Sequence, residues 1–151
     1  MIKVSFNVDE PCWRKEMPLF RKSILKAAKV TLAMANSSKN NGLEVNFLLT
    51  SNSKIRLLNK RYRNKDKSTN VLAFQMNENI FGDNYEIGDI AISLQKILNE
   101  SKKLKIQKYK YLSKITIHGV LHLLGFDHKT NKQYEEMNNI EQKVFQKIFH
   151  Q

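Results

Sequence analysis

One stretch of the chain, His118-Gly119-Val120-Leu121-His122-Leu123-Leu124-Gly125-Phe126-Asp127-His128, contains three of its four histidines. His118 and His122 are four residues apart, a spacing that places both imidazoles on one face of a helix, one turn apart. Gly125 follows three residues later, and glycine is the usual residue where a helix ends in a left-handed turn because it has no Cβ to clash. The chain can then reverse and bring His128 beside the other two rings. The stretch therefore predicts a helix, its end, and three imidazoles around one point.

Three neutral imidazoles around one point make a metal site with an open fourth position, which is the catalytic rather than the structural zinc arrangement. We expect His118, His122 and His128 to hold one zinc ion per chain, although Ni, Cu and Fe bind such sites too. Three neutral ligands leave the ion its full charge, which lowers the pKa of a bound water toward about 7 and makes it a nucleophile at neutral pH. A lone histidine pair at this spacing is more often a packing or surface feature, but three histidines and a glycine at these offsets indicate a metal site.

The spacing H-x3-H-x2-G-x2-H resembles the zinc-binding pattern of the metzincin peptidases, with one departure. Those peptidases carry a glutamate directly after the first histidine as their general base, and Gly119 stands at that position here. The metal ligands are therefore present, but the base of the peptidase reaction is absent.

Three segments resemble the YbeY family of bacterial rRNA-maturation endoribonucleases. The histidine stretch matches the family signature, with Phe126 in the place of the usual tyrosine. Residues 58–74, LNKRYRNKDKSTNVLAF, and Gly88-Asp89-Ile90 match two further family motifs, so that the resemblance covers most of residues 55–130. The chain departs from the family at Ser68, Ala73 and Gln75, around the loop before a predicted strand and at the end of that strand, and none of the three is a predicted metal ligand.

The resemblance implies a single-strand-specific, metal-dependent endoribonuclease that acts in 16S rRNA 3′-end maturation and ribosome quality control. Ribosomal RNA and the ribosome are the implied partners, the cytoplasm is the implied location, and a zincin-like arrangement of sheet and helices is the implied fold. Two other functions stay open. One is a metal-dependent hydrolase of another substrate, with the peptidase disfavoured by Gly119, and the other is a non-catalytic ribosome-assembly factor whose metal is structural.

Arg63 is the candidate for stabilising charge on a phosphate. Its guanidinium is always charged and binds phosphate oxygens in a bidentate manner. In the family, the arginine of the Tyr-Arg pair is the functional residue beside the metal, and that residue corresponds to Arg63. Composition alone would make Arg63 one more solvated residue of a basic run, but the family pattern selects it. We assign the rest of that run to the positioning of RNA phosphates: Lys60, Arg61, Lys65 and Lys67.

Three other polar residues near these motifs have more ordinary explanations. Asp127 either hydrogen-bonds the free N–H of a ligand imidazole and fixes its tautomer, or caps the following helix. Asp89 is not expected to be a fourth ligand, because Gly88 beside it indicates close approach of another backbone within a strand. His150 is the penultimate residue and is expected to be solvated.

The composition is that of a soluble globular protein. A length of 151 residues corresponds to one domain, here residues 1–151. Cys12 is the single cysteine, so that no disulfide can form within the chain, which fits a reducing compartment. We find no signal peptide and no apolar run long enough to span a membrane. The net charge of +12 favours polyanionic partners, although a lysine- and asparagine-rich composition would also account for it.

Hydrophobic periodicity predicts an α+β domain in which one small mixed sheet of about four strands packs with helices. The segment 108–124 is apolar nearly all round, which predicts a central helix that carries the histidines. The run at 71–74 is wholly apolar, which predicts a central strand antiparallel to its successor. The predicted strands are 2–8, 43–50, 71–74 and 86–93, and the predicted helices are 18–36, 52–63, 93–98, 108–124 and 131–149.

Overall fold

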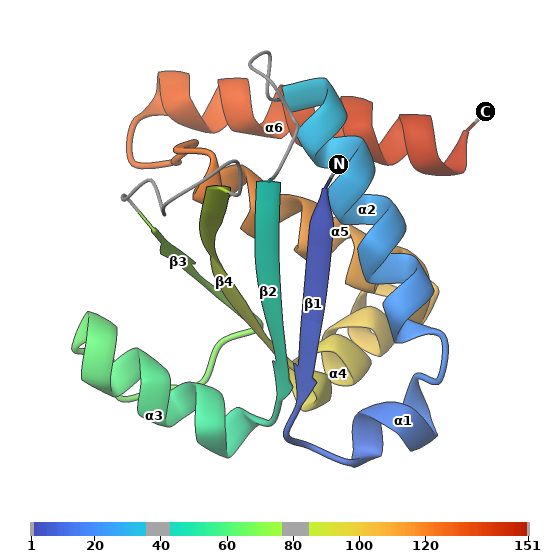
Figure 1. Cartoon of the computed structure of the whole chain (residues 1–151), viewed down its shortest axis with the longest axis vertical. Coiled ribbons are helices and arrows are strands. Elements are labelled where there is room, and N and C mark those ends of the chain that lie inside the picture. The colour runs from blue at the N-terminus through green and yellow to red at the C-terminus, as the bar shows by residue number, and fades with distance from the viewer. Residues whose placement is uncertain (1, 36–42, 77–84, 151) are drawn as a thin grey trace.

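Four strands form one mixed sheet in the order β1-β2-β4-β3 (Figure 1). The computed structural model describes residues 2–35, 43–76 and 85–150. Its strands are β1 (Lys3–Val8), β2 (Leu43–Thr50), β3 (Val71–Gln75) and β4 (Tyr85–Ser93). Strands β1, β2 and β4 run parallel to one another, and β3 is antiparallel to β4. The predicted α+β fold with a small mixed sheet is confirmed.

The helices of the described residues are α1 (Cys12–Glu16), α2 (Phe20–Ala35), α3 (Asn52–Arg63), α4 (Leu94–Leu104), α5 (Lys108–Leu123) and α6 (Asn131–Phe149). Helix α1 was not predicted; it follows Pro11 and buries Trp13, whose Nε1 donates to the carbonyl of Thr50 at 3.0 Å. Helix α4 is longer than the predicted 93–98 and takes in the start of a lysine-rich segment at 101–110. The sequence also predicts turns at 36–42 and 82–84, and both lie outside the described residues. Within those residues, no helix is both long and apolar enough to cross a lipid bilayer.

Strand β3 lies at the edge of the sheet, so the prediction of a central strand is wrong. Its apolar run is explained by helices on both of its faces instead of strands along both of its edges. On one face, Leu72 packs in a cluster with Ile55 of α3 and Ala91 of β4. On the other face, Val71 lies against α5, where Gly119 leaves space for it. The free edge of β3 is therefore available to line a cavity.

Helix α5 occupies the middle of the domain, as predicted. It contacts β3 and β4 of the sheet and also packs against α2, α4 and α6. Helix α6 lies across α2 and α5 through a cluster of buried side chains, which comprises Ala27, Ile117, Leu121, Met137, Val144 and Ile148. The histidine-bearing helix is thus held on several sides by apolar contacts, which makes it a rigid support for its side chains.

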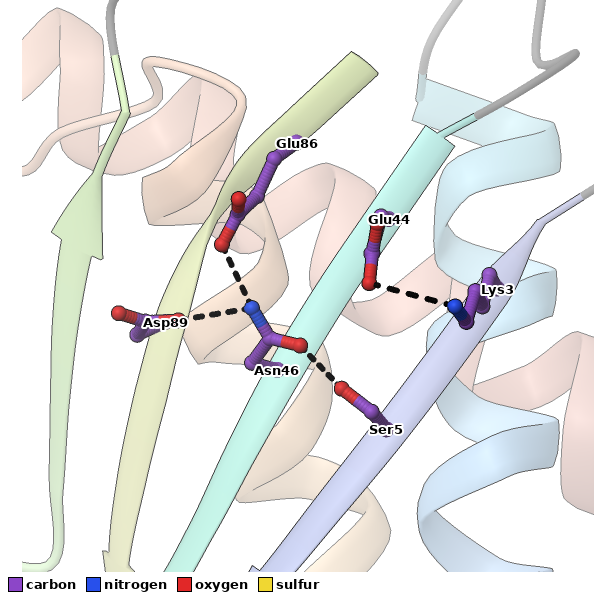
Figure 2. Close-up of polar contacts among 6 residues, drawn as sticks. All are labelled: Lys3, Ser5, Glu44, Asn46, Glu86 and Asp89. Atoms are coloured by element: carbon purple, nitrogen blue, oxygen red, sulfur yellow. Dashed lines mark hydrogen bonds and ion pairs between the residues drawn. The ribbon is translucent and has the colours of Figure 1, made fainter. Parts of the chain in front are cut away.

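The sheet face opposite α2 and α5 carries a row of polar side chains across β1, β2 and β4 (Figure 2). The side-chain amide of Asn46 donates to Glu86 at 2.6 Å and to Asp89 at 3.1 Å, and its oxygen accepts from the hydroxyl of Ser5. Lys3 Nζ lies 3.8 Å from a carboxylate oxygen of Glu44. These cross-strand contacts occupy the Asp89 carboxylate.

At Gly88, the strands β3 and β4 and the helix α5 lie close together. Its φ is +147°, and a Cβ placed there would lie 2.2 Å from the carbonyl oxygen of Phe74 and 2.7 Å from Cδ2 of Leu123. Gly125 also has a positive φ, of +98°, but a Cβ there would meet no atom within 4 Å. Both positions favour glycine because of their positive φ, but only Gly88 also lacks space for a Cβ.

We expect Gly88→Ala to lower the free energy of unfolding by about 3 kcal/mol or more, because the methyl group forces the backbones of β3 and β4 apart. The matched variant Gly125→Ala should cost only about 1–2 kcal/mol, the penalty of its backbone conformation. Urea denaturation with chelator present measures both without a contribution from bound metal. Equal losses for the two variants would contradict the close contact at Gly88.

Candidate metal centre and adjoining cavity

Helix α5 begins and ends with groups that fix the positions of its histidines. The side chain of the N-cap residue Gln107 accepts from the backbone N–H groups of Tyr109 and Lys110. At the other end, the N–H of Gly125 donates to the carbonyl of His122 at 3.1 Å, and the N–H of Phe126 donates to that of Leu121 at 3.0 Å. This pair of bonds is the Schellman motif, in which a residue of positive φ reverses the chain. The predicted helix end at Gly125 is confirmed.

The reversal brings the three histidines together. Their ligand nitrogens all lie within 4.8 Å of one another. The Nε2 atoms of His118 and His122 are 3.0 Å apart, and the ring of His128 lies 5.8 Å from that of His118 and 5.1 Å from that of His122, between centroids. His118 and His122 are half-buried on α5, whereas His128 is exposed on the loop that follows.

Oxygen acceptors outside the triad hold two of the rings. Nδ1 of His118 bonds to Oε1 of Glu141 on α6, which turns Nε2 of the same ring toward His122. His122 makes a backbone hydrogen bond to Phe126. Burial, followed by the nearby rings of His118 and His128, lowers the pKa of His122 and so favours its neutral form. Neutral imidazole is the form that binds a metal ion.

This donor set fits a divalent transition metal. His118, His122 and His128 each present a ring nitrogen to one point, and imidazole suits Zn, Cu, Fe and Ni. A set of three protein ligands also leaves a position for water or substrate, as in catalytic zinc sites. The triad could therefore bind one metal ion.

A cavity of about 660 Å³ adjoins the triad and is lined by all three histidines together with Arg63. Arg63 ends α3, and its Nη2 donates to the carbonyl of Ala73 on β3 at 2.6 Å. The guanidinium carbon lies 5.6 Å from the centroid of the Phe74 ring. Two residues of the edge strand thus hold this arginine at the cavity wall.

The four basic residues assigned to RNA lie along α3 and the loop after it. Lys65 lines the cavity, and Lys60, Arg61 and Lys67 are exposed beside it in sequence. The loop is anchored because Asn59 Nδ2 donates to the carbonyl of Lys67 at 2.9 Å, and Arg56 Nε donates to Asp66 at 2.8 Å. Their role in RNA binding stays a prediction.

The remaining candidate residues are Asp127, Asp89 and His150. Oδ1 of Asp127 accepts from the backbone N–H of His128 at 2.7 Å, and Oδ2 lies 3.7 Å from Lys129 Nζ. Thr130, not Asp127, caps α6, where it forms a capping box with Gln133. Asp89 contacts Asn46 on the sheet face and is outside the group of clustered ligand atoms found among the described residues. His150 stands at the C-terminal end of α6.

Sequence reasoning missed two residues that contact the histidine helix. Glu141 bonds to His118 from 23 positions further along the chain. Gln75, one of the three departures from the family motifs named above, donates from Nε2 to the carbonyl of His122 at 2.9 Å. The signal available for Glu141 was a carboxylate at helical spacing between Met137 and Val144, two residues of the apolar stripe of α6. No comparable signal marked Gln75.

The structure also explains why glycine follows His118. A Cβ at Gly119 would lie 3.2 to 3.3 Å from side-chain atoms of Ile90 and Val71, which is closer than ordinary van der Waals contact. A glutamate at this position would therefore start from a crowded point and be directed at the sheet. The absence of the peptidase base is thus tied to how closely α5 packs on β3 and β4.

Together these features define an α+β protein in which a three-imidazole metal site opens into a cavity with an arginine in its wall. The family model described as Endoribonuclease YbeY matches residues 10–149. Curated relatives named Endoribonuclease YbeY include the protein of Bartonella henselae, 31% identical over 98% of this chain and 94% of that protein. Others are those of Sulfurihydrogenibium sp., 37% identical over 72% of each chain, and Ruthia magnifica, 41% identical over 70% of this chain and 72% of that protein.

A solved structure gives the same fold. A Thermotoga maritima protein determined in solution matches with a TM-score of 0.58 and 22% identity, over 99% of this chain and 90% of that one. The chain belongs to the Endoribonuclease YbeY family, a family of RNA-hydrolysing enzymes.

We expect His118→Ala, His122→Ala and His128→Ala each to abolish stoichiometric metal binding, because two imidazoles alone make a much weaker site. His150→Ala is the control, since His150 lies at the far end of α6, and it should retain full metal. Elemental analysis of the purified variants measures this. Full retention by any of the first three would contradict the triad as the metal site.

Proposed function

We propose that this protein is a single-strand-specific, metal-dependent endoribonuclease of ribosomal RNA, acting in the cytoplasm in 16S rRNA 3′-end maturation and ribosome quality control, with residues 1–151 as one catalytic domain. Family membership supports the RNA substrate. The observation that carries the mechanism is that Arg63 and the three histidines line one cavity. Zinc is the proposed metal because three imidazoles with an open position are typical of catalytic zinc sites.

The cavity suits one RNA strand better than a duplex. Its volume, about 660 Å³, is in the range of sites that enclose a small organic group. A single strand can unstack and place one nucleotide in such a space, whereas an RNA duplex keeps its bases inside the helix. Lys65 and Lys129 of the cavity lining add positive charge for the phosphates that flank the cleaved bond.

The three histidines and Arg63 have different roles in the proposed phosphodiester hydrolysis. His118, His122 and His128 hold the metal, which when bound would activate water and offset negative charge on the phosphate. Arg63 donates to a non-bridging phosphate oxygen on which charge accumulates. A guanidinium has five N–H donors, so that its bond to Ala73 leaves others for the phosphate. The bond to Ala73 and the ring of Phe74 orient the fork before substrate arrives.

Hydrolysis of a peptide is the less favoured reaction for this site. A metal-dependent peptidase of the resembled pattern needs a carboxylate directly after the first histidine. Gly119 occupies that position and packs against Ile90 and Val71. The charge of +12 also favours a polyanionic substrate over a peptide.

We expect chelator-treated protein to lose RNA cleavage and to regain it when zinc is added back, and we expect single-stranded RNA to be cut faster than a duplex of the same sequence. Gel analysis of end-labelled RNA, with the chelator removed before the assay, measures both. RNA binding without turnover in the metal-loaded protein would instead favour a non-catalytic assembly factor.

Arg63→Lys should reduce cleavage by roughly 10²-fold or more, the scale seen when a positioned charge-stabilising donor is removed. Lysine keeps the charge but lacks the bidentate fork, so RNA affinity should change little and bound metal should not change. The matched control is Arg14→Lys on α1, which should cleave like the unmodified protein. If cleavage and binding by Arg63→Lys fall by the same factor, Arg63 only positions the RNA.

A further inference from the structure

Glu141 occupies a position where the pattern of α6 calls for an apolar residue. Met137, Val144 and Ile148 are buried and pack against α2 and α5. Glu141 lies four residues after the first of these and three before the second, on the same side of the helix. Its side chain is only 18% exposed. A carboxylate at such a place is costly unless a hydrogen-bond partner or a cation compensates it, so a specific contact must account for it.

That contact is with the first histidine of the triad. Oε1 of Glu141 bonds to Nδ1 of His118, whose side chain is 31% exposed. A carboxylate accepts hydrogen bonds and does not donate, so the ring nitrogen it meets carries the proton. The other nitrogen, Nε2, is then the one with a free lone pair, and it lies 3.0 Å from Nε2 of His122.

We propose that Glu141 is the positioning residue of the metal centre, which fixes His118 as the Nδ1–H tautomer and raises the affinity of its Nε2 for the metal. A carboxylate behind a ligand imidazole orients the ring and makes its free nitrogen more basic. The proposal rests on the proposed metal site. Its effect passes through His118, so Glu141 itself touches neither RNA nor metal.

The contact also links the ligand to a separate element of the fold. His118 and Glu141 belong to α5 and α6, which are joined by the loop that carries His128. Glu141 further lines a hollow of about 370 Å³ together with Lys114 and His150. Among the acidic residues of α6 in the described chain, Glu135 and Glu136 are exposed, and they supply matched controls.

The test uses Glu141→Leu, Glu141→Gln and the control Glu135→Gln in the full chain. Leucine suits the apolar stripe and keeps the helix packed, while glutamine keeps an oxygen acceptor but loses the charge. We expect zinc affinity, measured by competition with a chromophoric chelator, to fall about 10–100-fold in Glu141→Leu. Glu141→Gln should fall less, and Glu135→Gln should match the unmodified protein.

Nitrogen-15 NMR of metal-free protein, about two pH units above the ordinary histidine pKa, reports the tautomer independently of metal and RNA. His118 should be the Nδ1–H form in the unmodified protein and in Glu141→Gln, and should lose that preference in Glu141→Leu. Unchanged zinc affinity in Glu141→Leu, or weakened affinity with an unchanged tautomer, would overturn the positioning role. So would an equal loss in Glu135→Gln, whereas failure to cut RNA would bear on the proposed function alone.

Discussion

The close approach of α5 to the sheet is the constraint on which the rest of the structure depends. A side chain would be crowded at two positions of this contact: Gly88 on β4, where a Cβ would lie 2.7 Å from Cδ2 of Leu123 on α5, and Gly119 on α5, where it would lie 3.2 to 3.3 Å from Ile90 and Val71. Because α5 sits this close, His118 and His122 line the same cavity as the edge strand β3. The same approach crowds any side chain at the position after His118. The close packing of α5 therefore places the site beside β3 and leaves little room for a side chain where the peptidases carry their base.

The edge position of β3 gives that strand a second use. The backbone groups of a central strand bond to two neighbours, but among the described strands β3 pairs only with β4. Its other side can therefore bond elsewhere: the carbonyl of Ala73 accepts from Arg63, and the side chain of Gln75 reaches the carbonyl of His122. Strand β3 thus ties α3, which carries the arginine, to α5, which carries two of the histidines. Unpaired edges are usually a liability, and here the bond from Arg63 occupies the carbonyl of Ala73 on that edge.

Local spacing made part of the site predictable from the sequence. The convergence of the three histidines depends on one helix and one turn, so the offsets of His118, His122, Gly125 and His128 were sufficient. The place of Arg63 came only from the resemblance to the family, because composition gives no reason to single it out from Lys60, Arg61 and Lys65. The position of β3 was mispredicted because an apolar run shows only that both faces of a strand are buried. It does not show whether another strand pairs with each of its edges. Glu141 was missed because its partner is distant in sequence.

The three imidazoles are not held equally firmly, and this follows from the elements that carry them. His118 and His122 stand on a helix packed on several sides, and each bonds to an acceptor away from the metal position, Glu141 for the one and Phe126 for the other. His128 is exposed on a short loop. That loop is fixed at both ends, by the Schellman motif at Gly125 and by the capping box at Thr130, and Asp127 holds the backbone N–H of His128 between them. Helix ends and packing thus fix the backbone positions of all three histidines during folding, which lowers the conformational entropy that is lost when a metal binds.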